Sequence, residues 1–293
     1  MSTLRLGLAQ LGAHLGGLDR NLARHHQLIE RARAERVDLL VFPELGLTGY
    51  LLQDLHAEVA MRADDERLLE LASAAGDACS AVVGFVEESA DHRLFVSAAL
   101  LEGGTVAQVT RKTYLPSYGL FDERRFFAAG DVLSAVDSRL GVRLGISICE
   151  DFWHLPVPLL QALDGAQVLV NISSSPGRDV SAAVEGGLGT AASWRALLRT
   201  YAMLTGCYVV YVNRVGVEES ITFWGGSEVV GPRGDSVFRA PLHDEGLFVA
   251  EIEPDEIRRE RVATPLMRDE RPELVARQLE RLMRARGGLP EEA

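Results

Sequence analysis

The chain has 293 residues, of which 47% are hydrophobic and 25% are charged, as is usual for globular proteins. Its formal net charge is −12 at pH 7, and it lacks a long basic run, which disfavours nucleic acids and anionic membranes as partners. Its apolar runs fall well short of the roughly 20 residues that a membrane-spanning helix needs. A chain of this length buries enough apolar surface to fold without disulfides or metals.

The N-terminus leads directly into a strand-like pattern, with Leu4, Leu6 and Leu8 alternating, so we expect no cleaved signal peptide. The chain has three cysteines, Cys79, Cys149 and Cys207, and they lack CxxC spacing. A sparse, odd set of this kind argues against a disulfide framework and for a reducing compartment, so we expect a cytoplasmic location.

The first half of the chain alternates between helix-like and strand-like patterns. After the first strand, the spacing of 4, 3, 4 and 3 residues predicts one face of a helix made of Leu18, Leu22, His25, Ile29 and Ala32. The run at 37–42, which is apolar except for Asp38, predicts a strand covered on both faces. A helix follows at 65–78, and strands follow at 80–86, 95–101 and 105–110. Glu102-Gly103-Gly104, between the last two, is typical of a hairpin.

The second half continues in the same way. Strands are predicted at 142–148, 168–172, 207–212, 227–230, 235–239 and 246–252, and helices at 159–163, 191–205 and near 274–283. From about Asp255 the chain is polar, and its last seven residues, 287–293, are expected to fray. The mixture of βα units and hairpins predicts an α/β fold with mixed sheets and helices packed outside. We expect one domain over 1–293, with a tail from about 255 to 293.

Three polar residues directly follow apolar strands, where ligands and chemistry gather in open α/β sheets. They are Glu44, Lys112 and Cys149. A cysteine attacks as its thiolate, which a nearby ammonium favours and a carboxylate generates by taking the proton. A fixed cation and the backbone N–H after the nucleophile stabilise the oxyanion that forms on an attacked amide. This set suffices for acyl transfer, and the seven histidines show neither a motif nor metal-ligand spacing.

The segments around these residues resemble the signature segments of the nitrilase superfamily of carbon–nitrogen hydrolases. They read Val41-Phe42-Pro43-Glu44-Leu45, Arg111-Lys112-Thr113-Tyr114-Leu115-Pro116 and Ile148-Cys149-Glu150-Asp151. The resemblance covers roughly residues 4–252. It implies an αββα sandwich of two sheets, a homo-oligomer, and a cysteine mechanism with Cys149 as nucleophile, Glu44 as base and Lys112 at the oxyanion. A second glutamate follows the lysine in many members, and Glu123 matches it.

Within the superfamily the chain looks most like the glutaminase domain of glutamine-dependent NAD synthetases. The resemblance lies in residues 42–55, in 115–123 and in Cys149-Glu150-Asp151. It implies a glutamine pocket whose candidate substrate-binding residues are Tyr118, Phe121, Glu150, Ser175 and Arg178. A planar guanidinium suits a bidentate contact with an α-carboxylate, which is the role implied for Arg178.

One departure from that branch concerns ATP. The chain shows neither an SGGxDS-like pyrophosphatase loop nor a GxxxxGK[ST] loop, so no cofactor is predicted. The leading hypothesis is therefore a thiol-dependent amidohydrolase that releases ammonia from glutamine or a similar ω-amide, with a separate synthetase subunit as a candidate ammonia acceptor. Two alternatives are a stand-alone amidase or N-carbamoyl hydrolase, and a catalytically silent subunit that binds a partner.

Overall fold

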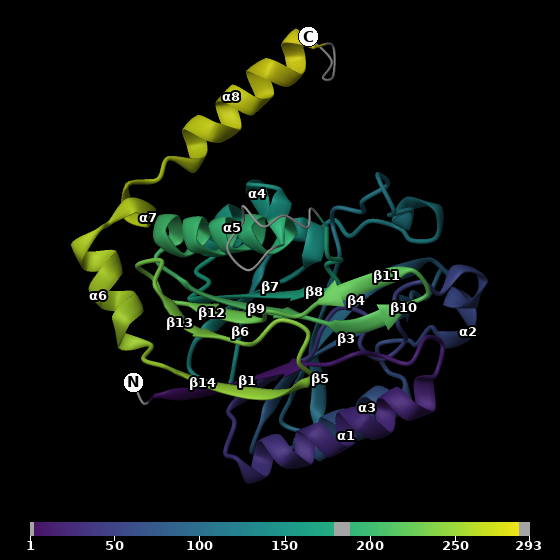
Figure 1. The fold of residues 1–293 in the computed structure, drawn as a ribbon. Coiled ribbons are helices and arrows are strands. Elements are labelled where there is room, and N and C mark those ends of the chain that lie inside the picture. The colour runs from purple at the N-terminus through teal and green to yellow at the C-terminus, as the bar shows by residue number, and fades with distance from the viewer. Residues whose placement is uncertain (1–2, 179–187, 287–293) are drawn as a thin grey trace.

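The structure, a computed structural model, describes residues 3–178 and 188–286. Two six-stranded sheets pack face to face, and helices cover their outer faces (Figure 1). The first sheet has the order β14 (Gly246–Ile252), β1 (Leu4–Gln10), β2 (Leu39–Val41), β3 (Ser80–Glu88), β4 (Leu94–Glu102) and β5 (Thr105–Arg111). The second has the order β13 (Ser236–Arg239), β12 (Glu228–Val230), β9 (Tyr208–Asn213), β8 (Val168–Ser173), β7 (Arg143–Ile148) and β6 (Ala135–Asp137).

Both sheets are mixed. In the first, β1, β2 and β3 are parallel and the remaining neighbours are antiparallel; in the second, β7, β8 and β9 are parallel. A short extra hairpin joins β10 (Val215–Glu218) to β11 (Ile221–Trp224). The prediction of an α/β sandwich of two mixed sheets with outer helices is confirmed.

The helices lie where the apolar faces of the sheets need cover. Helices α1 (Leu18–Ala34) and α3 (Glu66–Ala75) pack together against the first sheet, and α4 (Pro156–Leu163) and α5 (Gly189–Thr205) cover the second. The short α2 (His56–Val59) lies near one end of the sandwich. Three 3₁₀ turns, η1 (Gln53–Leu55), η2 (Glu123–Arg125) and η3 (Cys149–Trp153), occupy loops.

Strand β2 shows how the alternation of side chains builds two cores. Leu39 and Val41 belong to the core between the two sheets, whereas Leu40 belongs to the core beneath α1 and α3. Successive side chains of a strand point to opposite faces, so a continuous apolar run is what a strand buried on both faces requires. This explains the run at 37–42, although the strand itself covers only Leu39–Val41.

Helix ends differ from prediction for identifiable reasons. The helix predicted at 65–78 begins only at Glu66, because Asp65 is its N-cap and accepts from the Arg67 backbone N–H at 3.0 Å. It ends at Ala75, because Gly76 adopts φ +61°. The helix predicted at 159–163 begins earlier, at Pro156, since proline is well suited to a first helical turn.

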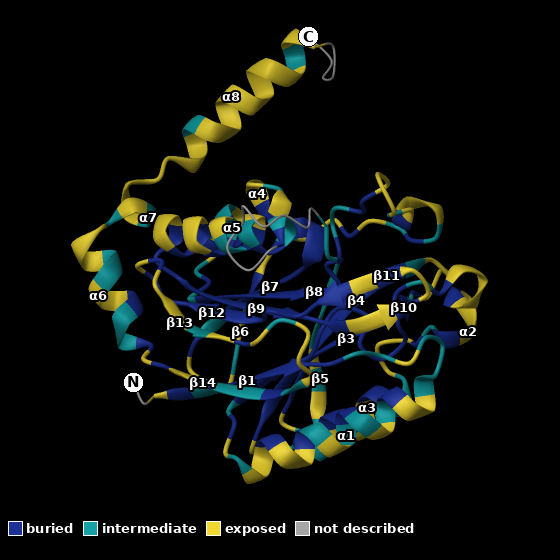
Figure 2. Cartoon of the chain, in the orientation of Figure 1, coloured by how far each residue is buried: buried dark blue, intermediate teal, exposed yellow. Residues whose placement is uncertain are grey.

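The C-terminal tail is helical over most of its described length. It contains α6 (Asp255–Ala263), α7 (Leu266–Asp269) and α8 (Pro272–Ala285). Helix α8 stands away from the sandwich, and its side chains are largely exposed (Figure 2). Residues 287–293, which we expected to fray, lie outside the described residues. Within the described ranges, no helix is both long and apolar enough to cross a bilayer.

Candidate active site

The three strand-end residues meet at one edge of the sandwich. Glu44 follows β2, Lys112 follows β5, and Cys149 follows β7. The Lys112 ammonium lies 2.7 Å from Glu44 Oε1 and 2.7 Å from Glu123 Oε1. Both glutamates and the lysine are almost completely buried. The structure therefore brings Glu44, Lys112 and Glu123 into one buried network, and the charges of all three act on the thiol of Cys149.

The surrounding backbone holds Glu44 in place. Its Oε2 accepts from the Ser174 backbone N–H at 2.7 Å, while its carbonyl accepts from the Ser174 hydroxyl at 2.8 Å. Both carboxylate oxygens therefore have partners. The chain at Glu44 passes so close to β3 that a Cβ on Gly84 would lie 2.5 Å from the Pro43 carbonyl oxygen. Only glycine permits that approach.

Lys112 is held as a cation. Burial opposes its charge, but the carboxylates of Glu123 and Glu44 more than offset that cost and raise the pKa of Lys112 well above its usual value. Lys112 is also the only lysine among the 30 lysines and arginines of the chain. A compact ammonium on a flexible stem reaches two carboxylates at one point, which the planar fork of arginine does less readily.

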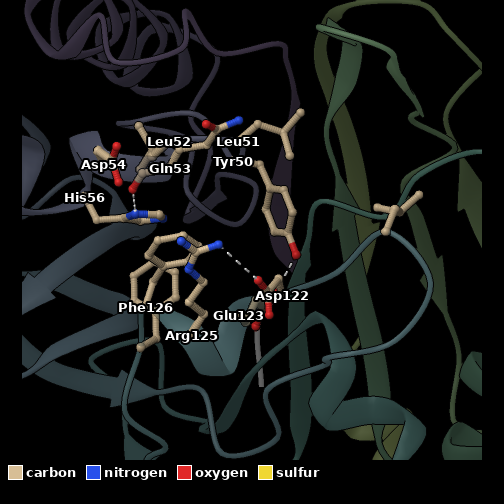
Figure 3. Close-up of a pocket in the computed structure, with 12 residues that line it drawn as sticks. Tyr50, Leu51, Leu52, Gln53, Asp54, His56, Asp122, Glu123, Arg125 and Phe126 are labelled. Atoms are coloured by element: carbon tan, nitrogen blue, oxygen red, sulfur yellow. Dashed lines mark hydrogen bonds and ion pairs between the residues drawn. The ribbon is translucent and has the colours of Figure 1, made fainter.

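Glu123 is the third corner of the network. Its Oε1 accepts from the Lys112 ammonium and, at 2.6 Å, from the Tyr50 hydroxyl (Figure 3). Its Oε2 has no hydrogen-bond partner among the described residues. Burial and the charge of Glu44 raise the pKa of Glu123 to about 7, although Lys112 and Tyr50 favour its ionised form. Glu123 also lines a cavity of about 380 Å³ that Tyr50, His56 and Arg125 help to form.

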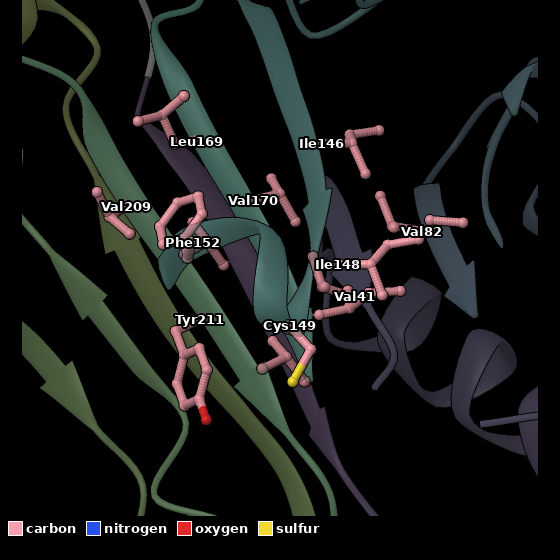
Figure 4. Close-up of a cluster of buried hydrophobic side chains, with 14 of the residues drawn as sticks. Val41, Val82, Ile146, Ile148, Cys149, Phe152, Leu169, Val170, Val209 and Tyr211 are labelled. Carbon is pink, nitrogen blue, oxygen red and sulfur yellow. The ribbon is translucent and has the colours of Figure 1, made fainter. Parts of the chain in front are cut away.

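Cys149 directly follows β7 and belongs to the buried cluster between the sheets, near Ile148 and Val41 (Figure 4). Its backbone adopts φ +46°, which is rare for a residue other than glycine and is typical of functional positions. Burial and then the charge of Glu44 raise the pKa of its thiol, although Lys112 lowers it. The resting side chain is therefore the neutral thiol, and it needs a base before it can attack.

Asp151 ties the nucleophile segment to the lysine segment. One carboxylate oxygen accepts from the backbone N–H groups of Thr113 and Tyr114 at 3.0 and 2.9 Å. The other accepts from the Ile148 backbone N–H at 3.0 Å. Since Lys112 and Cys149 directly adjoin these donors, one buried carboxylate fixes the distance between the two segments.

A cavity of about 250 Å³ opens beside Cys149. It is lined by all five residues that the sequence suggested for substrate binding, namely Tyr118, Phe121, Glu150, Ser175 and Arg178, and by Trp153 and Trp194, which sequence reasoning missed. The cavity thus presents one carboxylate and one guanidinium on aromatic walls.

The polar groups of this cavity are partly engaged. The Tyr118 hydroxyl lies 3.0 Å from both Glu150 oxygens. The Ser175 hydroxyl accepts from two indole N–H groups, that of Trp194 at 2.9 Å and that of Trp224 at 3.3 Å. The Arg178 guanidinium lies over the Phe121 ring at 4.9 Å, and its Nη2 has no hydrogen-bond partner among the described residues.

Three more residues that shape the site were not given roles from the sequence: Tyr50, Asp151 and Ser174. Tyr50 falls inside a segment that carries the family resemblance, so a search of that segment for hydroxyls could have found it. The contacts of Asp151 and Ser174 are to backbone atoms of distant segments and leave no local signal. Among residues 3–178 and 188–286, no three His, Cys, Asp or Glu side chains gather closely enough to hold a metal ion.

Comparison with known proteins identifies the family of the chain. The family model described as carbon–nitrogen hydrolase matches residues 5–261. The chain belongs to this family. It is 34% identical over 266 residues to the glutamine-dependent NAD(+) synthetase of Xylella fastidiosa strain Temecula1, which covers 90% of this chain and 46% of that protein. The hydrolase spans about half the length of the curated relatives it matches.

Solved structures show the same architecture. The glutamine-dependent NAD⁺ synthetase of Acinetobacter baumannii matches with a TM-score of 0.77 and 28% identity, over 87% of this hydrolase and 47% of that chain. An amidase from Nesterenkonia sp. matches with a TM-score of 0.77 and 25% identity, over 94% of this hydrolase and 96% of that chain. The hydrolase is thus similar both to synthetases and to an amidase.

Proposed function

We propose that this carbon–nitrogen hydrolase is a thiol-dependent amidohydrolase that releases ammonia from glutamine or a similar small ω-amide. The observation that supports the proposal most strongly is the buried network of Glu44, Lys112 and Glu123 beside Cys149. A base, a fixed cation and a thiol are the groups that amide cleavage through a thioester needs. Cys149 lines the cavity of about 250 Å³, where a substrate could reach its sulfur.

In the first step Glu44 accepts the proton of the Cys149 thiol as the sulfur attacks the amide carbon. A base is required because burial keeps that thiol protonated at neutral pH. The new C–S bond moves the carbonyl electron pair onto oxygen. Lys112 and the backbone N–H of Glu150, which follows the nucleophile, stabilise the resulting oxyanion.

In the second step the tetrahedral intermediate collapses and the C–N bond breaks. Glu44 returns its proton to the leaving nitrogen, so that ammonia departs and a thioester remains on Cys149. Water then gives a proton to Glu44 as it attacks the thioester. A second collapse releases the carboxylic acid and restores the thiol, and Glu123 keeps Lys112 charged throughout.

The cavity suits a substrate that carries both charges of an α-amino acid. Arg178 provides a planar fork for a carboxylate, and Glu150 provides a carboxylate for an ammonium. Tyr118 and Phe121 wall the site, and Ser175 adds a hydroxyl. Glutamine carries both charged groups at one end and the scissile amide at the other, so these contacts would set the distance from the recognition end to Cys149.

Steady-state ammonia release tests the proposal with glutamine, its decarboxylated analogue and simple aliphatic amides. Wild type should prefer glutamine. Arg178→Ala should raise the KM for glutamine by about tenfold or more, since a carboxylate contact is lost, with little effect on the decarboxylated analogue. Equal turnover of all these amides by wild type, unchanged by Arg178→Ala, would exclude the glutamine assignment.

A second candidate is a stand-alone amidase or N-carbamoyl hydrolase. It is favoured by the amidase from Nesterenkonia sp., whose likeness spans nearly all of both chains. The same assay, extended to carbamoyl compounds and nitriles, separates the two. No turnover of any compound would instead favour the third reading, a catalytically silent subunit.

The proposal extends to assembly. We propose a single hydrolase domain over residues 1–293 with a tail from about 255, and a homo-oligomer in which that tail contacts a neighbouring subunit. The exposed apolar side chains of α8 support this. The ammonia would be consumed by a synthetase, because the curated relatives named glutamine-dependent NAD(+) synthetase are about twice as long as the matched region.

A further inference from the structure

Glu218 is a buried carboxylate outside the proposed chemistry, at the end of β10. Its Oε2 accepts from two successive backbone N–H groups, those of Tyr50 at 2.9 Å and Leu51 at 3.1 Å. Its Oε1 accepts from Arg214. One side chain of the β10–β11 hairpin therefore holds the backbone of a loop that lies 168 residues away in the sequence.

The loop is built to receive that carboxylate. Gly49 adopts φ +85°, and a Cβ there would lie 2.9 Å from the Leu15 Cα and 3.1 Å from Glu218 Oε1. Only glycine lets the chain turn in this conformation and at this distance. The two N–H groups that follow then point together at one acceptor, in the way that backbone nests bind anions.

Tyr50 carries this restraint to the proposed active site. Its hydroxyl donates to Glu123 Oε1 at 2.6 Å, and its ring meets the Phe121 ring edge-on, with centroids 6.3 Å apart. The Tyr50 ring makes a second edge-on contact with the ring of Phe223, which belongs to β11 of the hairpin; the two ring centroids are 6.2 Å apart. The ring is thus fixed between the hairpin and the network that holds Lys112.

The negative charge of the buried Glu218 is compensated by the guanidinium of Arg214. Arg214 is 1% exposed, and its guanidinium lies 4.5 Å from the centre of the Phe223 ring. A buried ion pair whose partner also binds backbone donors is a rigid anchor, and removing one member leaves an uncompensated charge. A surface ion pair would not hold a loop in this way.

We propose that Glu218 is a positioning residue that fixes Tyr50 against Glu123, through the backbone N–H groups of Tyr50 and Leu51. The proposal rests on the proposed function only in assigning Glu123 a part in catalysis; it does not depend on the substrate being glutamine. Glu218 itself lines neither the cavity of about 380 Å³ nor that of about 250 Å³. Its bonds are to Arg214 and to the backbone of the loop that carries Tyr50, so we expect its effect on turnover to pass through that loop.

The test is a double-mutant cycle of Tyr50→Phe and Glu218→Asp, with whichever amide wild type cleaves best. Glu218→Asp keeps a charge for Arg214 but is too short to reach both backbone donors. Tyr50→Phe removes only the hydroxyl that donates to Glu123. Each change should lower kcat/KM by roughly tenfold, as expected for a lost hydrogen bond to a charged group. The double variant should be no slower than Tyr50→Phe alone, because both act through one contact.

The pH profile separates positioning from general loss of structure. The Tyr50 hydroxyl favours the ionised form of Glu123, so its loss should move the acid limb of kcat/KM to higher pH, and Glu218→Asp should move that limb in the same direction. Glu218→Gln serves as a second variant if Glu218→Asp does not fold. The matched control is Glu228→Gln, which removes another buried carboxylate, paired with Arg239 at 2.8 Å, and should leave the limb in place.

Additive losses in the double variant, or an unmoved acid limb in Glu218→Asp, would overturn the proposal. These outcomes are distinct from failure of the proposed function. That failure would appear as retained turnover in Cys149→Ala, or as no turnover of any amide by wild type. In the latter case, an unchanged environment of the Tyr50 ring in Glu218→Asp, measured by NMR of labelled tyrosine, would overturn the positioning role.

Discussion

Lys112 shows at the scale of one residue how the site constrains the sequence. Every other basic side chain of the chain is an arginine. The one lysine is buried between two carboxylates, each 2.7 Å from its ammonium. An ammonium donates three hydrogen bonds from a single atom, so it can bind both glutamates and still face an oxyanion. The geometry of the network therefore suits lysine at this position better than arginine.

Substitutions in the network test the assigned roles. Glu44→Gln removes proton acceptance with little change in shape, and Lys112→Ala removes the cation. Each should lower kcat by about 100-fold or more, measured as ammonia release, since positioned bases and oxyanion partners contribute at least that much. Lys112→Arg should not restore activity, because a guanidinium cannot place one donor atom between the two glutamates. Near-normal kcat in Glu44→Gln would mean that another group takes the proton.

The identity of the candidate catalytic residues could be predicted from the sequence, but the contacts that hold them could not. Glu44, Lys112 and Cys149 each follow an apolar run, and that local signal is visible in the chain itself. The bond from Tyr50 to Glu123 and the bonds from Ser174 to Glu44 join segments 73 and 130 residues apart. Such long-range hydrogen bonds leave no periodic pattern in the sequence, because they depend on how the two sheets pack.

At the scale of elements, Asp151 joins the end of β7 to the segment after β5. Asp151→Ala would leave three backbone donors without their acceptor. Unsatisfied buried donors cost roughly 1–3 kcal/mol each, so the free energy of unfolding should fall by at least about 2 kcal/mol in urea titration. Turnover should fall as well, because the position of Lys112 relative to Cys149 is no longer fixed.

The matched control for Asp151 is Asp164→Ala. Asp164 accepts from one backbone N–H, that of Ala135 in the edge strand β6, at 2.7 Å. Its carboxylate is 46% exposed and also lies 3.7 Å from the Arg143 guanidinium. Its loss should cost under about 1 kcal/mol and leave kcat unchanged. Equal destabilisation by the two substitutions would show that Asp151 is not a special link between the segments.

Elements with a clear period were predicted, and short irregular ones were not. The buried face of α5, with Trp194, Leu198 and Tyr201, follows the spacing seen in the sequence. The hairpin β10–β11 was missed because its strands have four residues each and carry the buried Glu218 in place of an apolar side chain. The residue that broke the pattern is the one that holds the Tyr50 loop.

At the scale of the whole molecule, α8 is the helix that stands away from the sandwich and stays largely exposed. Val275, Leu279 and Leu282 recur at helical spacing and are 40%, 54% and 41% exposed, respectively. An apolar stripe of this kind costs free energy in water unless it is covered. The proposed homo-oligomer would cover it with a second copy of the chain.

Light scattering tests this assembly. Wild type should be larger than a monomer at working concentration, and Leu279→Glu combined with Leu282→Glu should shift it to monomer without changing its circular dichroism. Val262→Glu offers a control in α6, because Val262 is 70% exposed and lies outside that stripe. A monomeric wild type, or an assembly that survives the double substitution, would contradict the role of α8.

The central claim is that Cys149 attacks an ω-amide held as glutamine would be. It is tested most directly by inactivation with an electrophilic glutamine analogue that carries a diazoketone in place of the carboxamide, followed by peptide mapping. One adduct is expected, on Cys149, at a rate that glutamine slows and that Arg178→Ala reduces. Cys79 and Cys207 should stay unmodified, because Cys149 lines the cavity of about 250 Å³ and these two cysteines do not. Inactivation with the adduct on another residue, or full activity after prolonged exposure, would contradict the central claim.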